Sequence, residues 1–228
     1  MGKHRIAFPV VASVLLFGAS GCLVQSLDPF YTEANRVAVP GELLGEWRLV
    51  EDALTGVSSV GSDALKDRKP WVLEADHAIA YDWENVPARL DPVFFRVKDR
   101  LYCDVFATFP EPGEKPNVYW TLTVVPAHTL FRVFSGKDRL IFAALDPNRL
   151  VQEIRAGRVK LPMVESSLHR SVLFAASPGE WEAFLRDYDD RPDAFPGASV
   201  FVWQRPSSPA FSEPATAEAA GRPAEGSE

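Results

Sequence analysis

The sequence predicts a mainly β (α+β) domain, an antiparallel barrel or sandwich with two helices packed against it. Short runs rich in Val, Phe, Tyr, Trp and Leu alternate with turns rich in Gly, Pro, Asp and Lys, a pattern typical of many short strands. Two segments carry clear helix start signals. Because 46% of the residues are apolar, the chain can bury a substantial core, and we expect one domain over residues 41–205.

Ten strands are expected in this domain. They cover residues 45–51, 70–75, 78–83, 92–97, 101–107, 117–125, 129–134, 139–145, 171–175 and 198–204. The polar segment 55–70 is expected to form a loop or a short helix.

Two hairpins can be placed by the alternation of side chains between the faces of a sheet. In VFFRVKDRLYCDV, a three-residue loop at Lys98–Arg100 makes every pair on one face apolar. The expected pairs are Val97 with Leu101, Phe95 with Cys103 and Val93 with Val105. Cys103 therefore belongs in the core, with a reactive or intermolecular thiol as the alternative. The second hairpin, TLFRVFSGKDRLIFAAL, is predicted to turn at Ser135 to Asp138, where Gly136 gives backbone freedom.

Two helices are predicted from the residues at their ends. In DPNRLVQEIRAG, we expect Asp146 to cap the helix, Pro147 to take its first position and Gly157 to end it. In SPGEWEAFLRDY, Ser177 and Glu180 form a capping box. The apolar faces consist of Leu150, Val151 and Ile154 in the first helix, and of Trp181, Phe184, Leu185 and Tyr188 in the second.

Residues 1–21 have the layout of a secretory signal peptide. Two basic residues precede the apolar run IAFPVVASVLLF, which is shorter than the roughly 20 residues that a membrane-spanning helix needs. The small residues before Cys22 resemble the lipobox of bacterial lipoproteins, with Ala19 standing where Leu is usual. The resemblance implies cleavage before Cys22 and lipidation of its thiol. An ordinary signal peptide that happens to precede a cysteine is the alternative.

Lipidation would determine the cellular location of the protein. Two or more acyl chains hold a protein on a membrane essentially permanently, so the covalent lipid on Cys22 is the expected membrane contact. Leu23 follows Cys22 where an Asp would favour retention in the inner membrane. We therefore expect a protein of the bacterial cell envelope, anchored in the outer membrane.

The segments on either side of the domain differ from it in composition. Residues 22–40 have no sustained period and contain two prolines, so we expect a tether, in which Pro29–Tyr31 could still pack on the domain. Residues 206–228 are rich in Pro, Ala, Ser and Glu, which predicts a disordered tail.

The net charge argues against a nucleic-acid partner, and the cysteine content argues against a disulfide. Removal of residues 1–21 takes away Lys3 and Arg5, which leaves 22 basic residues against 31 acidic ones and a formal charge of −9. This excess argues against nucleic acid as a partner. Lipidation of Cys22 would leave Cys103 without a partner in the same chain, so we expect no disulfide.

The sequence shows no catalytic or metal-binding motif. The histidines of the processed chain, His77, His128 and His169, lie far apart without metal-ligand spacing. The acidic stretch DYDDRPD at 187–193 has Pro192 where a calcium loop of the EF-hand type needs Gly, so a solvated helix end is the prediction. We expect no metal, no cofactor and no enzymatic activity. A Ser-His-Asp triad built from distant residues stays open.

Gly45-Glu46-Trp47 resembles the G-x-W signature of lipocalins, whose Trp closes one end of a ligand-holding barrel. A carrier of this kind predicts a cavity beside Trp47 lined by Phe and Trp side chains. Against it, the large side chains of 92–97 and 129–145 look sufficient to fill the interior. The late capped helix and a second late strand are also unlike that family.

Several segments together resemble a group of uncharacterised bacterial lipoproteins. These proteins share a lipobox Cys followed by S-L-x-P-x-Y-T-E, an L-x-G-x-W first strand and a late strand that leads into a capped helix. The matching segments here are Cys22 with SLDPFYTE, LLGEW at 43–47, VFFRVKDRLYCDVF, VVPAHTLFRV and SVLFAASPGEWEAFL. The resemblance covers most of residues 22–190; it implies the anchor and the fold, and it assigns no catalytic residue.

The function predicted from these observations is a non-catalytic binding or structural role in the envelope. The partner would be an unknown protein or a small apolar ligand. The alternative is a lipocalin-like carrier of a small apolar molecule.

Overall fold

The computed structural model describes residues 23–52, 57–58, 67–107, 117, 127–165, 172–188, 190–191, 194–195 and 200–206. The expected signal peptide, Cys22, the expected strand 117–125 apart from Asn117, and the tail beyond 206 lie outside the described residues. The elements are β1 (Gln25–Ser26), β2 (Arg36–Val37), η2 (Gly41–Leu43), β3 (Gly45–Asp52), β4 (Val57–Ser58), β5 (Trp71–Leu73), β6 (Ala78–Tyr81), β7 (Pro87–Val97), β8 (Arg100–Ala107), β9 (His128–Ser135), β10 (Arg139–Ala144), α2 (Pro147–Arg155), β11 (Met163–Glu165), β12 (Val172–Phe174), α3 (Pro178–Tyr188) and β13 (Val200–Gln204).

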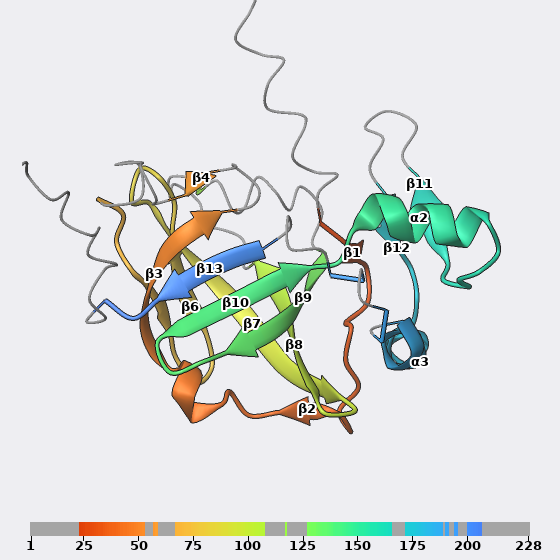
Figure 1. Cartoon of the computed structure of the whole chain (residues 1–228), viewed down its shortest axis with the longest axis horizontal. Helices are drawn as coiled ribbons and strands as arrows, with labels where there is room; N and C mark the ends of the chain where they lie inside the picture. The colour runs from red at the N-terminus through yellow and green to blue at the C-terminus, as the bar shows by residue number, and fades with distance from the viewer. Residues whose placement is uncertain are drawn as a thin grey trace, which may run out of the picture.

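Eight antiparallel strands close into a barrel. The order is β3-β5-β6-β7-β8-β9-β10-β13, and β13 pairs with β3 to complete the ring. The expected mainly β fold with two helices is confirmed, and the architecture is a lipocalin-like barrel (Figure 1). One feature departs from a simple up-and-down barrel, because α2, β11, β12 and α3 all lie between the seventh strand, β10, and the eighth, β13.

The register predicted for the first hairpin is wrong. Lys98 and Asp99 form a two-residue turn between β7 and β8, in which Lys98 has a φ of 55°. Phe94 therefore lies opposite Cys103, and Phe95 lies opposite Tyr102. The prediction assumed that one face is apolar and the other polar, whereas both faces of these strands are buried.

The two faces of β7, β8 and β9 belong to two separate cores. Phe94, Cys103 and Phe131 point into the barrel, which confirms that Cys103 is a core residue. The alternating residues Phe95, Tyr102 and Leu130 point outward into a second core. That second core is covered by α2, α3 and the N-terminal segment, which lie on one side of the barrel (Figure 1).

Both helix predictions are confirmed at their N-termini. The Asp146 carboxylate accepts hydrogen bonds from two backbone N–H groups of the first turn of α2 at 2.9 and 3.2 Å. In α3, the Ser177 N–H donates to the Glu180 carboxylate at 2.8 Å, and the Glu180 N–H donates to the Ser177 hydroxyl at 3.4 Å. This reciprocal pair is the predicted capping box. Gly157 follows α2 with a φ of 71°, as expected of a helix end.

Residues 23–40 belong to the folded body, which corrects their assignment as a tether. β1 continues the sheet beside β9, with Gln25 opposite Thr129. Val24 and Phe30 are fully buried, so the predicted packing of 29–31 on the domain holds for Phe30. The segment then runs down the side of the barrel to β2, which pairs with β7, and crosses beneath the barrel as η2 (Figure 1).

The acidic stretch after α3 ties the helix to the barrel. Asp190 contacts Lys98 at 2.8 Å and Arg100 at 2.7 Å, both in the β7–β8 turn region. The hydrogen bond from Lys98 is the main cause that lowers the pKa of Asp190.

Over the described residues, no helix is both long and apolar enough to cross a bilayer.

Candidate functional site: the barrel cavity

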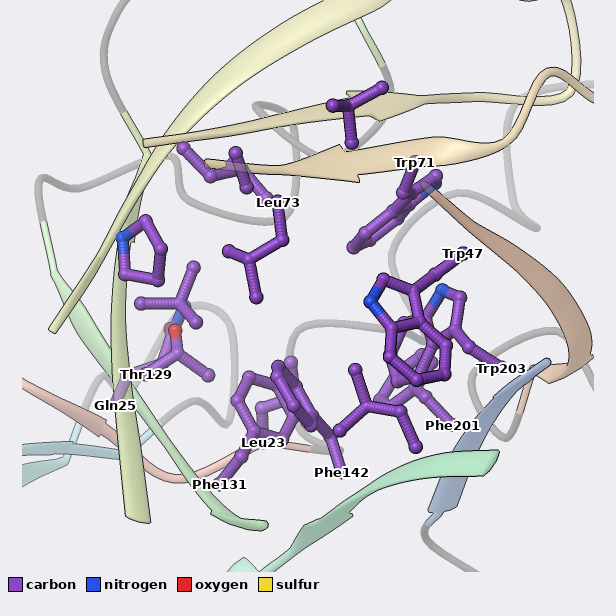
Figure 2. Close-up of a pocket in the computed structure, with 16 residues that line it drawn as sticks. Leu23, Gln25, Trp47, Trp71, Leu73, Thr129, Phe131, Phe142, Phe201 and Trp203 are labelled. Atoms are coloured by element: carbon purple, nitrogen blue, oxygen red, sulfur yellow. The ribbon is translucent and has the colours of Figure 1, made fainter. Parts of the chain in front are cut away.

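The interior of the barrel contains an apolar cavity of about 120 Å³. Figure 2 shows its side chains arranged as a ring around open space. The cavity predicted by the carrier alternative is therefore present, and the expectation that large side chains fill the interior is wrong. The lining residues are Leu23, Gln25, Trp47, Trp71, Val72, Leu73, Ala78, Leu90, Pro92, Val105, Thr129, Phe131, Leu140, Phe142, Phe201 and Trp203.

Large aromatic rings hold the wall in place. Trp203 lies 5.3 Å from Trp71 and 5.1 Å from Phe142, measured between ring centroids. Phe131 meets Phe201 edge to face at 5.7 Å. Rings in tilted contact keep one another in fixed orientations and have few rotatable bonds. They therefore surround the space without collapsing into it.

Trp47 closes the lower end of the barrel, the end marked by Leu43, Trp47 and Arg205. The indole N–H of Trp47 donates to the Leu43 carbonyl at 2.7 Å, and the Arg205 guanidinium lies 3.9 Å from the Trp47 ring centroid. Arg205 also donates to the carbonyls of Leu44 and Glu42 at 2.8 and 2.6 Å. This plug confirms the role expected of the Trp in the G-x-W triplet.

Gly45 is required by the same plug. Its φ is 104°, a conformation that side chains with a Cβ rarely adopt. A Cβ at this position would also lie 3.1 Å from the Arg205 guanidinium. Both constraints explain why the triplet begins with glycine.

Few polar groups reach the cavity. Gln25 and Thr129 lie side by side on paired strands at one side of the ring, and Trp203 lies at the other (Figure 2). Trp203 is 3% exposed, and its indole N–H has no hydrogen-bond acceptor within reach in the described structure. A buried donor without an acceptor costs about 1–3 kcal/mol, so this group is a local cost to the fold.

His128 lies on the outer face of β9 and is paired with a buried carboxylate. Its Nδ1 lies 2.9 Å from Asp104, and Asp104 also accepts the Phe30 N–H at 3.1 Å. Burial raises the pKa of Asp104 even though the His128 hydrogen bond opposes the shift. Ser26 pairs with His128 across the strands, but its hydroxyl donates to the Phe174 carbonyl and accepts from Trp181. These three residues therefore do not form a hydrogen-bonded triad, and the pair fixes the N-terminal segment.

The other expected candidates lie away from the cavity. His77 is grouped with Glu74 and Asp76, with ligand atoms within 4.8 Å of one another, at an exposed turn. This group was not predicted, although the adjacent letters E-A-D-H indicate it. His169 and Cys22 lie outside the described residues. The Cys103 thiol is fully buried, and burial raises its pKa well above the ordinary value, so it is held as a neutral thiol.

Compared with known proteins, the chain matches no family model and no solved structure. It is 31% identical over 94 residues to a glucosylglycerate hydrolase of Mycolicibacterium hassiacum. The match covers 40% of this chain and 21% of the hydrolase, so the chain spans about a fifth of the length of this curated relative.

Proposed function

We propose that this chain is a lipid-anchored protein of the bacterial envelope whose barrel binds a small apolar molecule without transforming it. The observation that carries the binding role is the apolar cavity inside the closed barrel. The lipobox-like sequence before Cys22 supports the anchor, and Leu23 supports the outer membrane.

The cavity suggests the size and the chemistry of the ligand. Its volume of about 120 Å³ is close to that of a dry apolar protein cavity of about 150 Å³ that accepts benzene. A six-membered ring or a short piece of an alkyl chain fits such a space.

A non-catalytic role agrees better with these residues than hydrolysis does. The partial likeness to the hydrolase does not extend to its whole length. The His128–Asp104 pair lies outside the barrel, and Ser26 is hydrogen-bonded to other groups. A structural role without a ligand is the second candidate, and it predicts no saturable binding.

Calorimetric titration with benzene and cyclohexanone tests the binding role. Both molecules fit the space, but the cyclohexanone carbonyl would lose its hydration in this apolar site, so benzene should bind more tightly. Ala78 borders the cavity, and Ala78→Leu should weaken binding of either molecule roughly tenfold because its added carbons occupy the site.

Ala80 provides the matched control, since it lies on the same face of β6 but does not line the cavity. Ala80→Leu should leave the affinity unchanged and lower the free energy of unfolding by about 1–3 kcal/mol. Absence of saturable binding to the parent protein, or equal loss of affinity in both variants, would reject the proposal.

The anchor is tested separately. Cys22→Ala should move the protein from the membrane fraction to the aqueous fraction of the native envelope. Mass spectrometry of the parent protein should find acyl groups on Cys22 at a new N-terminus. A variant that still fractionates with membranes would contradict the anchor and leave the cavity proposal standing.

A further inference from the structure

We infer that the upper end of the barrel rests on the bilayer, so that the cavity faces the membrane rather than open water. This inference depends on the lipid anchor proposed above. The upper end is the one opposite Trp47, and it is defined here by Leu23, Leu27 and the β6–β7 turn at 82–86. In Figure 1 the described chain begins at this end, while η2 lies at the other.

The anchor has almost no slack. Leu23 lines the cavity, Val24 is fully buried, and the Leu130 N–H donates to the Val24 carbonyl at 3.4 Å. One peptide unit, about 3.8 Å between Cα atoms, separates Cys22 from Leu23. A lipid on Cys22 would therefore hold the folded body close to the membrane. A long tether would have left the orientation free.

The anchor joins the barrel at the upper end. The N-terminal segment pairs with β9 at its first residues, with Gln25 opposite Thr129. β10, the other neighbour of β9 on that side, ends at Ala144, opposite Phe131. The chain thus enters where β9 begins and β10 ends, beside the cavity wall.

Two exposed apolar side chains lie at the same end. Trp83 is 53% exposed in the β6–β7 turn, and Leu27 is 47% exposed just beyond the start of β9. The turn is fixed, because the Asp82 carboxylate accepts the N–H groups of Glu84 and Val86, both at 2.9 Å. Trp83 is thus held outward on a rigid support. Tryptophan is favoured at the membrane–water interface, where an apolar body and an N–H donor are both accommodated.

The turns of the lower end carry more exposed charge. Its β9–β10 turn exposes Lys137, Asp138 and Arg139, and the β7–β8 turn exposes Lys98 and Asp99. Two apolar side chains are exposed there as well, Leu44 at 37% and Phe134 at 42%, but each lies beside an arginine. Arg205 donates to the Leu44 carbonyl, and the Arg132 guanidinium lies 4.6 Å from the Phe134 ring centroid. Clustered charges of both signs keep their hydration and do not enter a bilayer interface. This end therefore faces water.

The orientation brings part of the cavity wall close to the lipid. Leu23, Gln25 and Thr129 line the cavity at the end that faces the lipid. The membrane is thus both the attachment surface and the nearest store of apolar molecules.

Lipid-borne quenching of a fluorophore tests this orientation in the full-length lipidated protein. Trp83→Cys, Leu27→Cys and the matched lower-end variant Lys137→Cys would each be labelled with a nitrobenzoxadiazole dye. The introduced thiol is the reactive one, because Cys103 is fully buried and the lipid would occupy the thiol of Cys22. The proteins would be placed in phosphatidylethanolamine–phosphatidylglycerol vesicles that contain a spin-labelled phospholipid.

Labels at positions 83 and 27 should be quenched several-fold more strongly than the label at 137, and their emission should shift to the blue. Equal quenching at both ends, or stronger quenching at 137, would overturn the orientation. Flotation of the same vesicles separates the two proposals. Protein that floats without upper-end quenching rejects the orientation alone, whereas protein that fails to float rejects the anchor and the orientation with it.

Discussion

The inner and outer faces of β7–β9 belong to two apolar cores, one that surrounds a cavity and one that is filled by side chains. Inside the barrel, aromatic rings surround a cavity, and Trp203 keeps an unsatisfied N–H. On the outer face, Trp181 fills its site: it lies 4.6 Å from Phe30 and 5.4 Å from Phe174 between ring centroids, and its N–H donates to Ser26 at 3.1 Å. The difference indicates that the outer core stabilises the fold and that the inner core leaves room for a ligand.

The largest expected effect tests this division directly. Trp181→Ala should lower the free energy of unfolding by about 3–5 kcal/mol, because it opens a large void in a filled core and removes a hydrogen bond. Phe142→Ala should cost less than Trp181→Ala, because this ring is only partly buried and already borders open space. Denaturant unfolding measures both. Equal losses would mean that the two cores do not differ.

A smaller loss of stability is expected when the Trp47 end of the barrel loses Arg205. Arg205→Ala removes two hydrogen bonds to backbone carbonyls and the cation–π contact with Trp47. We expect a loss of about 1–2 kcal/mol by denaturant unfolding, together with a changed near-ultraviolet circular dichroism signal. Arg205→Lys keeps the charge but not the fork of donors, and it should recover only part of the loss. Full recovery with lysine would show that charge alone stabilises the plug.

The smallest expected effect is the pH dependence of the stability that Glu153 of α2 contributes. Hydrogen bonds from Arg158, and then from Arg191, lower the pKa of Glu153 to about 2. The unfolded chain takes up this proton at the ordinary pKa, so the stabilisation is present above that value and is lost as the pH falls toward about 2. The parent protein and Glu153→Gln should therefore differ in melting temperature at pH 6 and converge at low pH. A constant difference from pH 6 to pH 2 would contradict the assignment.

Features encoded by neighbouring residues were predictable from the sequence. The Asp146 cap and the Ser177–Glu180 capping box depend on groups three or fewer residues apart, so the local sequence predicts both. The β7–β8 register was not, because a strand buried on both faces carries no alternation that distinguishes one register from the next. The N-terminal segment was misread as a tether because its two-residue strands pair only with distant partners.

The sequence by itself determined the mainly β class and the starts of both helices, since each rests on composition or on short spacing. Only the tertiary structure decided the site. Trp71, Phe142 and Trp203 come from β5, β10 and β13, far apart in the chain, and barrel closure brings them around one space. Whether such side chains meet or leave a cavity depends on the closure and register of the strands. Those are set by pairing across the whole sheet, which no local pattern records.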